Sequence, residues 1–108
     1  MKTLTLPLKK KWFDMIKSGV KKEEYREIKP YWKIRLRNAQ KISQLTTVYS
    51  GFKNFDKVVF TLAYPKADDN EHRLEFNNPH IYIGKGRPEW GAEPGKNYFV
   101  ITWEAEKK

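Results

Sequence analysis

The amino-acid sequence predicts one α+β domain in which a small, strongly bent sheet or β-barrel of about six strands carries two helices from the N-terminal half. Three observations predict it. The chain has 108 residues, which fits a single domain over 1–108. Short runs of β-branched and aromatic residues, bounded by turn residues, recur along the C-terminal half, and helical spacing of apolar residues is confined to the N-terminal half.

The composition allows a compact core in a polar chain. Apolar residues make up 39% of the sequence, below the ~45–50% of an average globular protein. Four Trp, six Tyr and six Phe offset this shortage, because each such side chain buries ~150–250 Å². We therefore expect a folded protein rather than a disordered one.

The first two elements follow from apolar spacing. Leu4, Leu6 and Leu8 alternate with polar residues and predict a short strand with one buried face. Pro7 has no N–H for a ladder, so this strand belongs at an edge. Apolar residues at helical spacing then predict a helix over 9–18, which ends at a glycine with left-handed backbone.

The next segment allows two interpretations. Residues 21–28 alternate as in a strand, and Pro30 suits the first turn of a helix over 30–38. Trp32 and Leu36 form an i, i+4 pair, yet together with Ile34 they also alternate as in a strand. The proline favours the helix.

The remaining elements are strands and loops. Residues 39–56 are polar and mixed, which predicts a loop with one turn around Gly51. Residues 65–71 predict a turn, and 84–95 predict a Gly/Pro-rich loop. Four runs rich in β-branched and aromatic residues predict strands over Val58–Tyr64, Arg73–Phe76, His80–Ile83 and Tyr98–Trp103.

Several classes of protein are excluded. The chain has no cysteine, which rules out disulfides, Cys-ligated metals and thiol catalysis. His72 and His80 are the only imidazoles, and the acidic run around His72 is more typical of an exposed turn, so we expect no metal and no cofactor. No apolar run is long enough to span a bilayer. We expect a cytoplasmic protein without a membrane partner, and the oligomeric state stays open.

The positive charge is asymmetric. The formal net charge is +9, and residues 1–41 carry all of it, with thirteen Lys and Arg against four acidic residues. Such an asymmetry indicates an anionic partner, most often nucleic acid or an anionic membrane surface. The alternative is a lysine-rich surface that only keeps the protein soluble.

A charged motif follows the first predicted helix: Gly19-x-Lys21-x-x-Glu24-x-Arg26. In a strand, Glu24 and Arg26 share a face and can pair or bind one ligand together. Lys21 can join them only from the turn before the strand, where Gly19 permits the required backbone. Otherwise the motif is a solvated face of ion pairs, worth ~0–1 kcal/mol.

With Trp12 and Ile16 before it, this motif resembles the hallmark of the ASCH domain family, Gly-x-Lys-x-x-Glu-x-Arg. The segment Gly84–Gly91 and the final strand resemble the end of small bacterial members. The resemblance implies a PUA-like β-barrel and a function in binding RNA or a modified nucleoside. It also implies a basic, ligand-binding cleft at Gly19, Lys21, Glu24 and Arg26.

Some small relatives deacetylate N(4)-acetylcytidine with the motif Lys, a Thr and a further Glu. This chain has Glu24 at the Thr position, which removes the hydroxyl nucleophile, and Glu89 is one candidate for the further Glu. The resemblance therefore implies an amidohydrolase only as an alternative, with Lys21 and Glu24 as catalytic residues and Glu24 as a base toward water.

For RNA binding, cations must meet phosphates and aromatic rings must stack on bases. Tyr25, Trp32 and Trp90 are the stacking candidates, although Trp32 also fits a core. A protein-interaction domain with an acidic partner is a third possibility. The residues predicted to contact nucleic acid are Lys22, Tyr25, Lys33, Arg35, Arg37, Lys85, Arg87 and Trp90.

Overall fold

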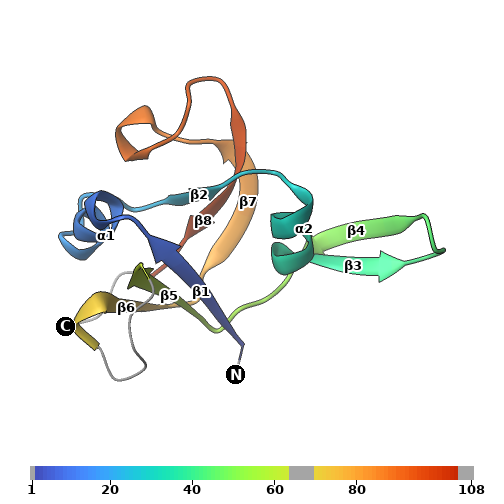
Figure 1. The fold of residues 1–108 in the computed structure, drawn as a ribbon, viewed down its shortest axis with the longest axis horizontal. Coiled ribbons are helices and arrows are strands. Elements are labelled where there is room, and N and C mark those ends of the chain that lie inside the picture. Colours follow the sequence, from blue (N-terminus) through green and yellow to red (C-terminus); the bar gives the residue numbers. More distant parts are fainter. Residues whose placement is uncertain (1, 64–69, 105–108) are drawn as a thin grey trace.

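Three separate sheets and two helices form the protein in the computed structural model, which describes residues 2–63 and 70–104 (Figure 1). The helices are α1 (Lys10–Lys17) and α2 (Pro30–Leu36). Two short 3-10 turns cover Asn70–His72 and Pro88–Trp90. The strands are β1 (Thr3–Leu8), β2 (Glu24–Arg26), β3 (Arg37–Lys41), β4 (Thr47–Phe52), β5 (Lys57–Leu62), β6 (Arg73–Asn77), β7 (His80–Lys85) and β8 (Asn97–Thr102).

The first sheet has the order β1-β5-β6. Strand β1 runs parallel to β5, with Leu6 opposite Phe60, and β5 pairs antiparallel with β6. As expected, Pro7 lies on an edge strand. Strand β1 has only one neighbouring strand, so the missing N–H of Pro7 can face away from the sheet. The leucines of β1 point inward, so the predicted one-sided strand is confirmed.

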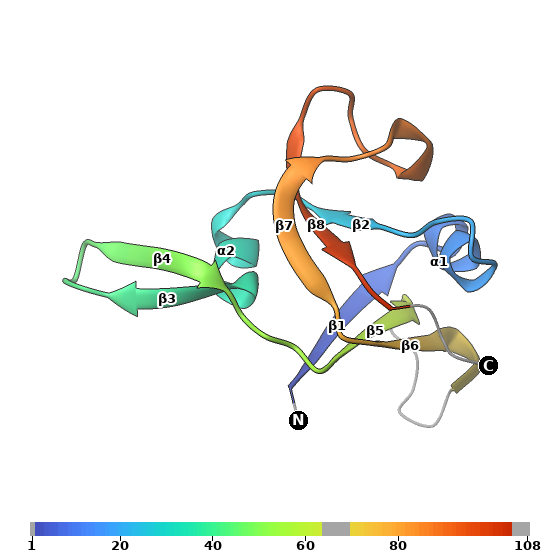
Figure 2. The ribbon, with the colours of Figure 1, turned by 180° about the vertical axis from the view of Figure 1, so that it is seen from behind.

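The second sheet, with the order β2-β8-β7, packs its inner face against the first. Both of its pairings are antiparallel, and Figure 2 shows β7 as a strongly curved strand beside β8. The two sheets and the helices share one apolar core. Its fully buried members are Leu4, Leu6, Leu36, Val58, Phe60, Phe99 and Ile101.

Both predicted helices are present. Helix α1 buries Phe13 and Ile16, and the chain leaves it through Gly19, whose φ of 85° is the left-handed conformation expected there. Helix α2 begins at Pro30 and buries Leu36 in the core. The helical interpretation of this segment is therefore confirmed.

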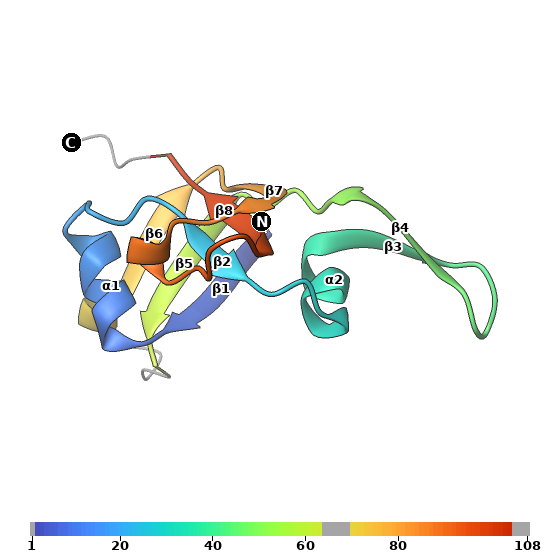
Figure 3. The ribbon, with the colours of Figure 1, turned by 90° about the horizontal axis from the view of Figure 1, so that it is seen from above.

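The loop predicted over 39–56 is wrong, because β3 and β4 pair there as an antiparallel ribbon. Between the pairs Arg37–Phe52 and Asn38–Ser50, Gly51 is an extra residue with φ 58°, a bulge that only the glycine backbone takes readily. The ribbon has no buried face, so its sequence shows no apolar alternation. We call residues 37–52 the arm; it projects from the body beside α2 (Figures 1 and 3).

Other expectations need correction. The described residues contain eight strands rather than about six, and their three sheets do not close into a barrel. The strand expected over 21–28 is reduced to β2, and the predicted loop over 84–95 begins inside β7. The remaining predicted strands are confirmed with small shifts. Tyr64 and most of the turn expected over 65–71 lie outside the described residues.

Neither helix meets the length and apolar character that a bilayer span requires, within residues 2–63 and 70–104. The protein has the small mixed α+β architecture that the sequence predicts. A cleft lies where β1, α1, β2, α2 and the loop after β7 come together.

Candidate functional site

The backbone gathers the charged motif in one place. After Gly19, the N–H of Lys21 donates to the Met15 carbonyl at 2.9 Å, which closes the turn that follows α1. Lys21 therefore lies just before β2. Glu24 and Arg26 are two residues apart on β2 and point to the same side of it, and β2 pairs with the central strand β8. Lys21 is thus placed in the turn before the strand, the position from which it can join Glu24 and Arg26.

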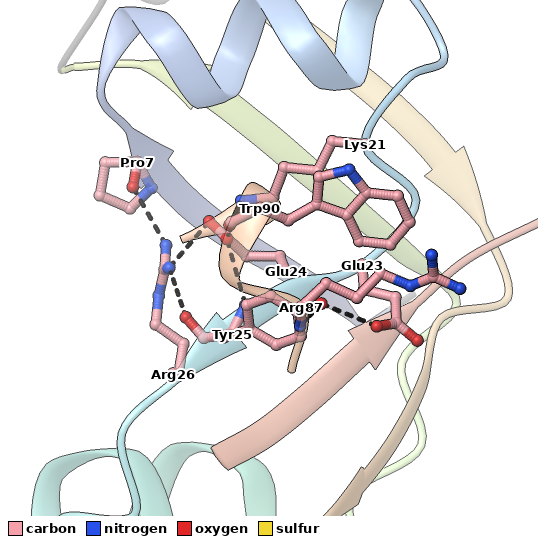
Figure 4. A network of polar contacts seen from close by, with 8 residues as sticks. All are labelled: Pro7, Lys21, Glu23, Glu24, Tyr25, Arg26, Arg87 and Trp90. Carbon is pink, nitrogen blue, oxygen red and sulfur yellow. Dashed lines mark hydrogen bonds and ion pairs between the residues drawn. The ribbon is translucent and has the colours of Figure 1, made fainter. Parts of the chain in front are cut away.

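Lys21, Glu24 and Arg26 form a continuous ionic network (Figure 4). The Lys21 ammonium lies 2.8 Å from Oε1 of Glu24, and Nη1 of Arg26 lies 2.8 Å from Oε2 of the same carboxylate. The backbone N–H of Tyr25 donates to Oε1 at 3.1 Å. Three donors from this chain thus converge on the Glu24 carboxylate.

The same cations tie distant segments together. The Lys21 ammonium also donates to the Trp90 carbonyl at 2.9 Å, and Nη2 of Arg26 donates to the Pro7 carbonyl at 3.1 Å. A third Arg26 bond reaches the Tyr25 carbonyl. Together with the bond to Glu24, these contacts use three of the five guanidinium donors, so Arg26 keeps donors for a ligand.

Burial separates the members of the network. The side chains of Lys21 and Glu24 are 1% and 5% exposed, whereas that of Arg26 is 16% exposed. Burial lowers the pKa of the Lys21 ammonium below its ordinary value, an effect that the neighbouring Glu24 carboxylate opposes. Lys21 and Glu24 therefore form the floor of the site, and Arg26 is the most exposed member of the network.

Three tryptophans surround this floor. A cleft of about 460 Å³ is lined by the network and by Trp12, Trp32 and Trp90, each from a different segment. The Lys21 ammonium lies 4.5 Å from the centre of the Trp12 ring, and Cζ of Arg26 lies 5.2 Å from that of Trp32. The cleft thus combines flat apolar walls with a polar floor.

The cleft is charge-balanced, which corrects the expectation of a basic cleft. Three cations and three carboxylates line it. The excess positive charge of the N-terminal region must therefore lie elsewhere on the surface. The charged lining residues are Lys9, Lys21, Arg26, Glu24, Glu27 and Glu93.

Tyr25 does not offer a stacking face, because only 8% of the residue is exposed. Its hydroxyl donates to Glu23 at 2.8 Å and accepts the backbone N–H of Arg87 at 3.0 Å (Figure 4). Burial raises the pKa of this phenol above its ordinary range, so it stays protonated. Tyr25 lines the cleft and positions the loop after β7, and its expected contact with bases stays a prediction that its burial does not favour.

The other residues predicted to meet nucleic acid spread over the surface. Lys22 and Gly19 line a different cavity, beside β6. Lys33, Arg35 and Arg37 lie on α2 and at the start of the arm. Lys85 and Arg87 are exposed near the cleft, with Cζ of Arg87 4.8 Å from the centre of the Trp90 ring.

Some cleft residues were not singled out from the sequence. Trp12 was noted only as part of the motif and not as a lining residue, and nothing in the sequence marked Glu93. Glu89, the candidate for a further catalytic carboxylate, is exposed and does not line the cleft. Gly91 lines the cleft. Its backbone lies so close to the Trp12 ring that a Cβ atom at this position would come within 2.9 Å of the ring.

Comparisons with known proteins found no match to any family model, any curated protein or any solved structure. In the described part of the chain, no three His, Asp or Glu side chains lie close enough together to hold a metal ion. The function of the cleft is therefore argued from its own chemistry.

Proposed function

We propose that the protein is a nucleic-acid-binding module of the ASCH type, and that its cleft takes an unpaired or modified nucleobase of RNA. One observation carries the proposal: a buried Lys21–Glu24–Arg26 network lies at the floor of a cleft walled by tryptophans. The PUA-like fold that this family implies is part of the proposal, since the observed sheets support only a small mixed architecture.

A nucleobase matches both parts of the cleft. It is flat and uncharged, so it can stack on an indole ring, which is worth ~1–3 kcal/mol for each base. Its edge carries carbonyl oxygens and amino groups, which suit the spare donors of Arg26 and the carboxylates on the rim. A phosphate suits the cleft less well, because the lining charges cancel.

Phosphates are instead expected to meet the basic surface outside the cleft. If a single strand covers about four phosphates there, the logarithm of its affinity should fall with the logarithm of salt concentration at a slope near −3. Fluorescence anisotropy of a short labelled single-stranded RNA, titrated between about 50 and 200 mM salt, measures this slope. A flat response would contradict the electrostatic half of the proposal.

The stacking half is tested by removing one wall. Trp32→Leu is expected to weaken binding of the same RNA by roughly 5–150-fold, the equivalent of one lost stacking contact. The matched control is Trp103→Leu. Trp103 packs on Phe60 and Phe76 and does not line the cleft, so this variant loses a partly buried indole without touching the site. Equal losses in both variants would remove the cleft from the binding mode.

The lowered pKa of Lys21 favours one second candidate, an amidohydrolase acting on acylated nucleosides, because a neutral amine can act as a base. Glu24 opposes it, since three donors already occupy the carboxylate. We therefore expect no release of cytidine from N(4)-acetylcytidine, measured by chromatography. Turnover that disappears in Lys21→Met would make hydrolysis the function.

A further inference from the structure

The arm, residues 37–52, is separated from the cleft and has almost no support from the body. Its strands pair only with each other, and the body supports it at its base alone, where α2 lies beside it and Phe52 packs on Phe99 of β8 (Figure 3). An isolated two-stranded hairpin is marginally stable in water. The arm therefore gains order from any surface that covers it.

The charge of this region identifies the kind of surface. From Ile28 to Phe55 the sequence contains six Lys and Arg and no Asp or Glu. Arg35 and Lys41 are exposed, and neither has a carboxylate partner among the described residues. A ribbon and helix with cations only are complementary to a polyanion.

The end of the arm is uncharged and rich in hydrogen-bonding side chains. Ile42 is 64% exposed and Leu45 is 98% exposed, next to Val48 at 44%. Seven of the other positions from 38 to 50 carry uncharged amide or hydroxyl side chains, and they are Asn38, Gln40, Ser43, Gln44, Thr46, Thr47 and Ser50. Asn, Gln, Ser and Thr are among the side chains that bond to base edges, and exposed apolar groups contact thymine methyls.

We propose that the arm is a second nucleic-acid surface, which inserts into the major groove of a B-form DNA duplex. The groove is ~12 Å wide and ~8.5 Å deep and admits a two-stranded ribbon. A strand of five residues spans ~17 Å, so the tip can reach the bases. Lys41 ends β3 beside the tip, where its long side chain can turn back to a phosphate that flanks the groove, whereas Arg35 lies on α2 and Arg37 directly after it. The proposal goes beyond the cleft and does not depend on it.

Two other occupants fit less well. A second copy of the chain would bring together two cationic arms with no carboxylate between Ile28 and Phe55 to pair them, which opposes self-association. An anionic membrane would have to bury Ser43, Gln44 and Thr46 with the tip, at the cost of desolvating polar groups without partners. Duplex DNA satisfies the cations, the polar side chains and the apolar tip together.

The test measures binding of a short labelled DNA duplex by anisotropy. Lys41→Glu is expected to weaken binding about tenfold at ~0.1 M salt and to reduce the magnitude of the salt slope by about 1. Lys17→Glu is the control with the same change of charge. Lys17 is exposed on α1, at the opposite end of the molecule from the arm, and should leave the affinity nearly unchanged (Figure 1).

The groove contact has its own signature. Replacing thymine by uracil in the duplex removes the major-groove methyls, and each methyl that Leu45 buries should account for about fourfold in affinity. The loss should appear with the natural chain and be absent in Leu45→Ser. Duplex RNA should bind more weakly, since the deep, narrow major groove of A-form RNA excludes side chains.

Several results would overturn the proposal: equal losses in Lys41→Glu and Lys17→Glu, duplex RNA binding as tightly as DNA, an arm that binds anionic vesicles instead of DNA, or an arm-dependent dimer. Trp90→Leu, which removes a wall of the cleft outside α2 and the arm, separates the two proposals. It should weaken binding of single-stranded RNA and leave duplex affinity unchanged, so failure at the cleft and failure at the arm are distinguishable.

Discussion

Replacing Glu24 with Gln is expected to lower the free energy of unfolding by about 3–5 kcal/mol. The amide keeps the shape of the side chain but removes the charge between two cations, one of which is 1% exposed. The Lys21 ammonium is then buried without a counter-charge, which is the costly outcome for a buried pair. Urea denaturation followed by tryptophan fluorescence measures the loss.

A pH series shows whether Lys21 is the cause. Burial lowers the pKa of Lys21 in the folded protein below 10.5, so the unfolded chain binds more protons between these two values and folding is favoured as the pH rises through that window. Without Glu24 this penalty grows, and the deficit of the variant should therefore shrink as the pH approaches 10.5.

Glu27→Gln is the matched control. Glu27 pairs with Lys29 at 3.0 Å on the surface, and such pairs contribute ~0–1 kcal/mol. The double variant Lys21→Met/Glu24→Gln should recover part of the loss, because it leaves no buried ammonium. If Glu24→Gln cost no more than Glu27→Gln, the network would be a solvated face of ion pairs after all.

Gly86→Ala is expected to destabilise the protein by about 3 kcal/mol, at the upper end of the cost of overpacking. A methyl group there would come within 2.6 Å of the Cβ of Ala92 and within 2.7 Å of the Tyr25 ring. Both neighbours are buried, at 6% and 8% exposure, so neither can move aside easily. The loop that carries Trp90 must shift instead, and the cleft with it.

Gly84→Ala is the control from the same segment. Its closest new contact, at 3.0 Å, is with the ring of Tyr82, which is 45% exposed and can turn away. Unfolding in urea should show a change within about 0.5 kcal/mol for this variant. Tight packing of the loop at Gly86 would be excluded if the two alanine variants had the same stability.

Periodicity predicted the elements that bury one face. The leucines of β1 and the apolar face of α1 alternate or repeat because a buried side must be apolar. The ribbon of β3 and β4 was missed for the same reason, since an arm exposed on both faces leaves no such pattern. The sequence also could not show that the strands form three separate sheets rather than one closed barrel, because this depends on pairings between strands distant in sequence.

The sequence predicted which charged residues form the candidate site, but not which other groups surround them. The spacing of Lys21, Glu24 and Arg26 allowed them to meet on the condition that the glycine before them made a turn, and that turn is present. The carbonyls of Pro7 and Trp90, which complete the network, come from opposite ends of the chain. Nothing local in the sequence shows which distant carbonyl will meet a given cation.

The sequence by itself determined the net charge of +9, the acid-free stretch from Ile28 to Phe55 and the order of the charged motif, because these are properties of the covalent chain. Only the tertiary structure decided that Lys21 and Glu24 are buried, that the cleft is charge-balanced, and that the basic stretch includes a projecting arm. Burial and cancellation of charge depend on which surfaces meet in space, and long-range packing brings those surfaces together.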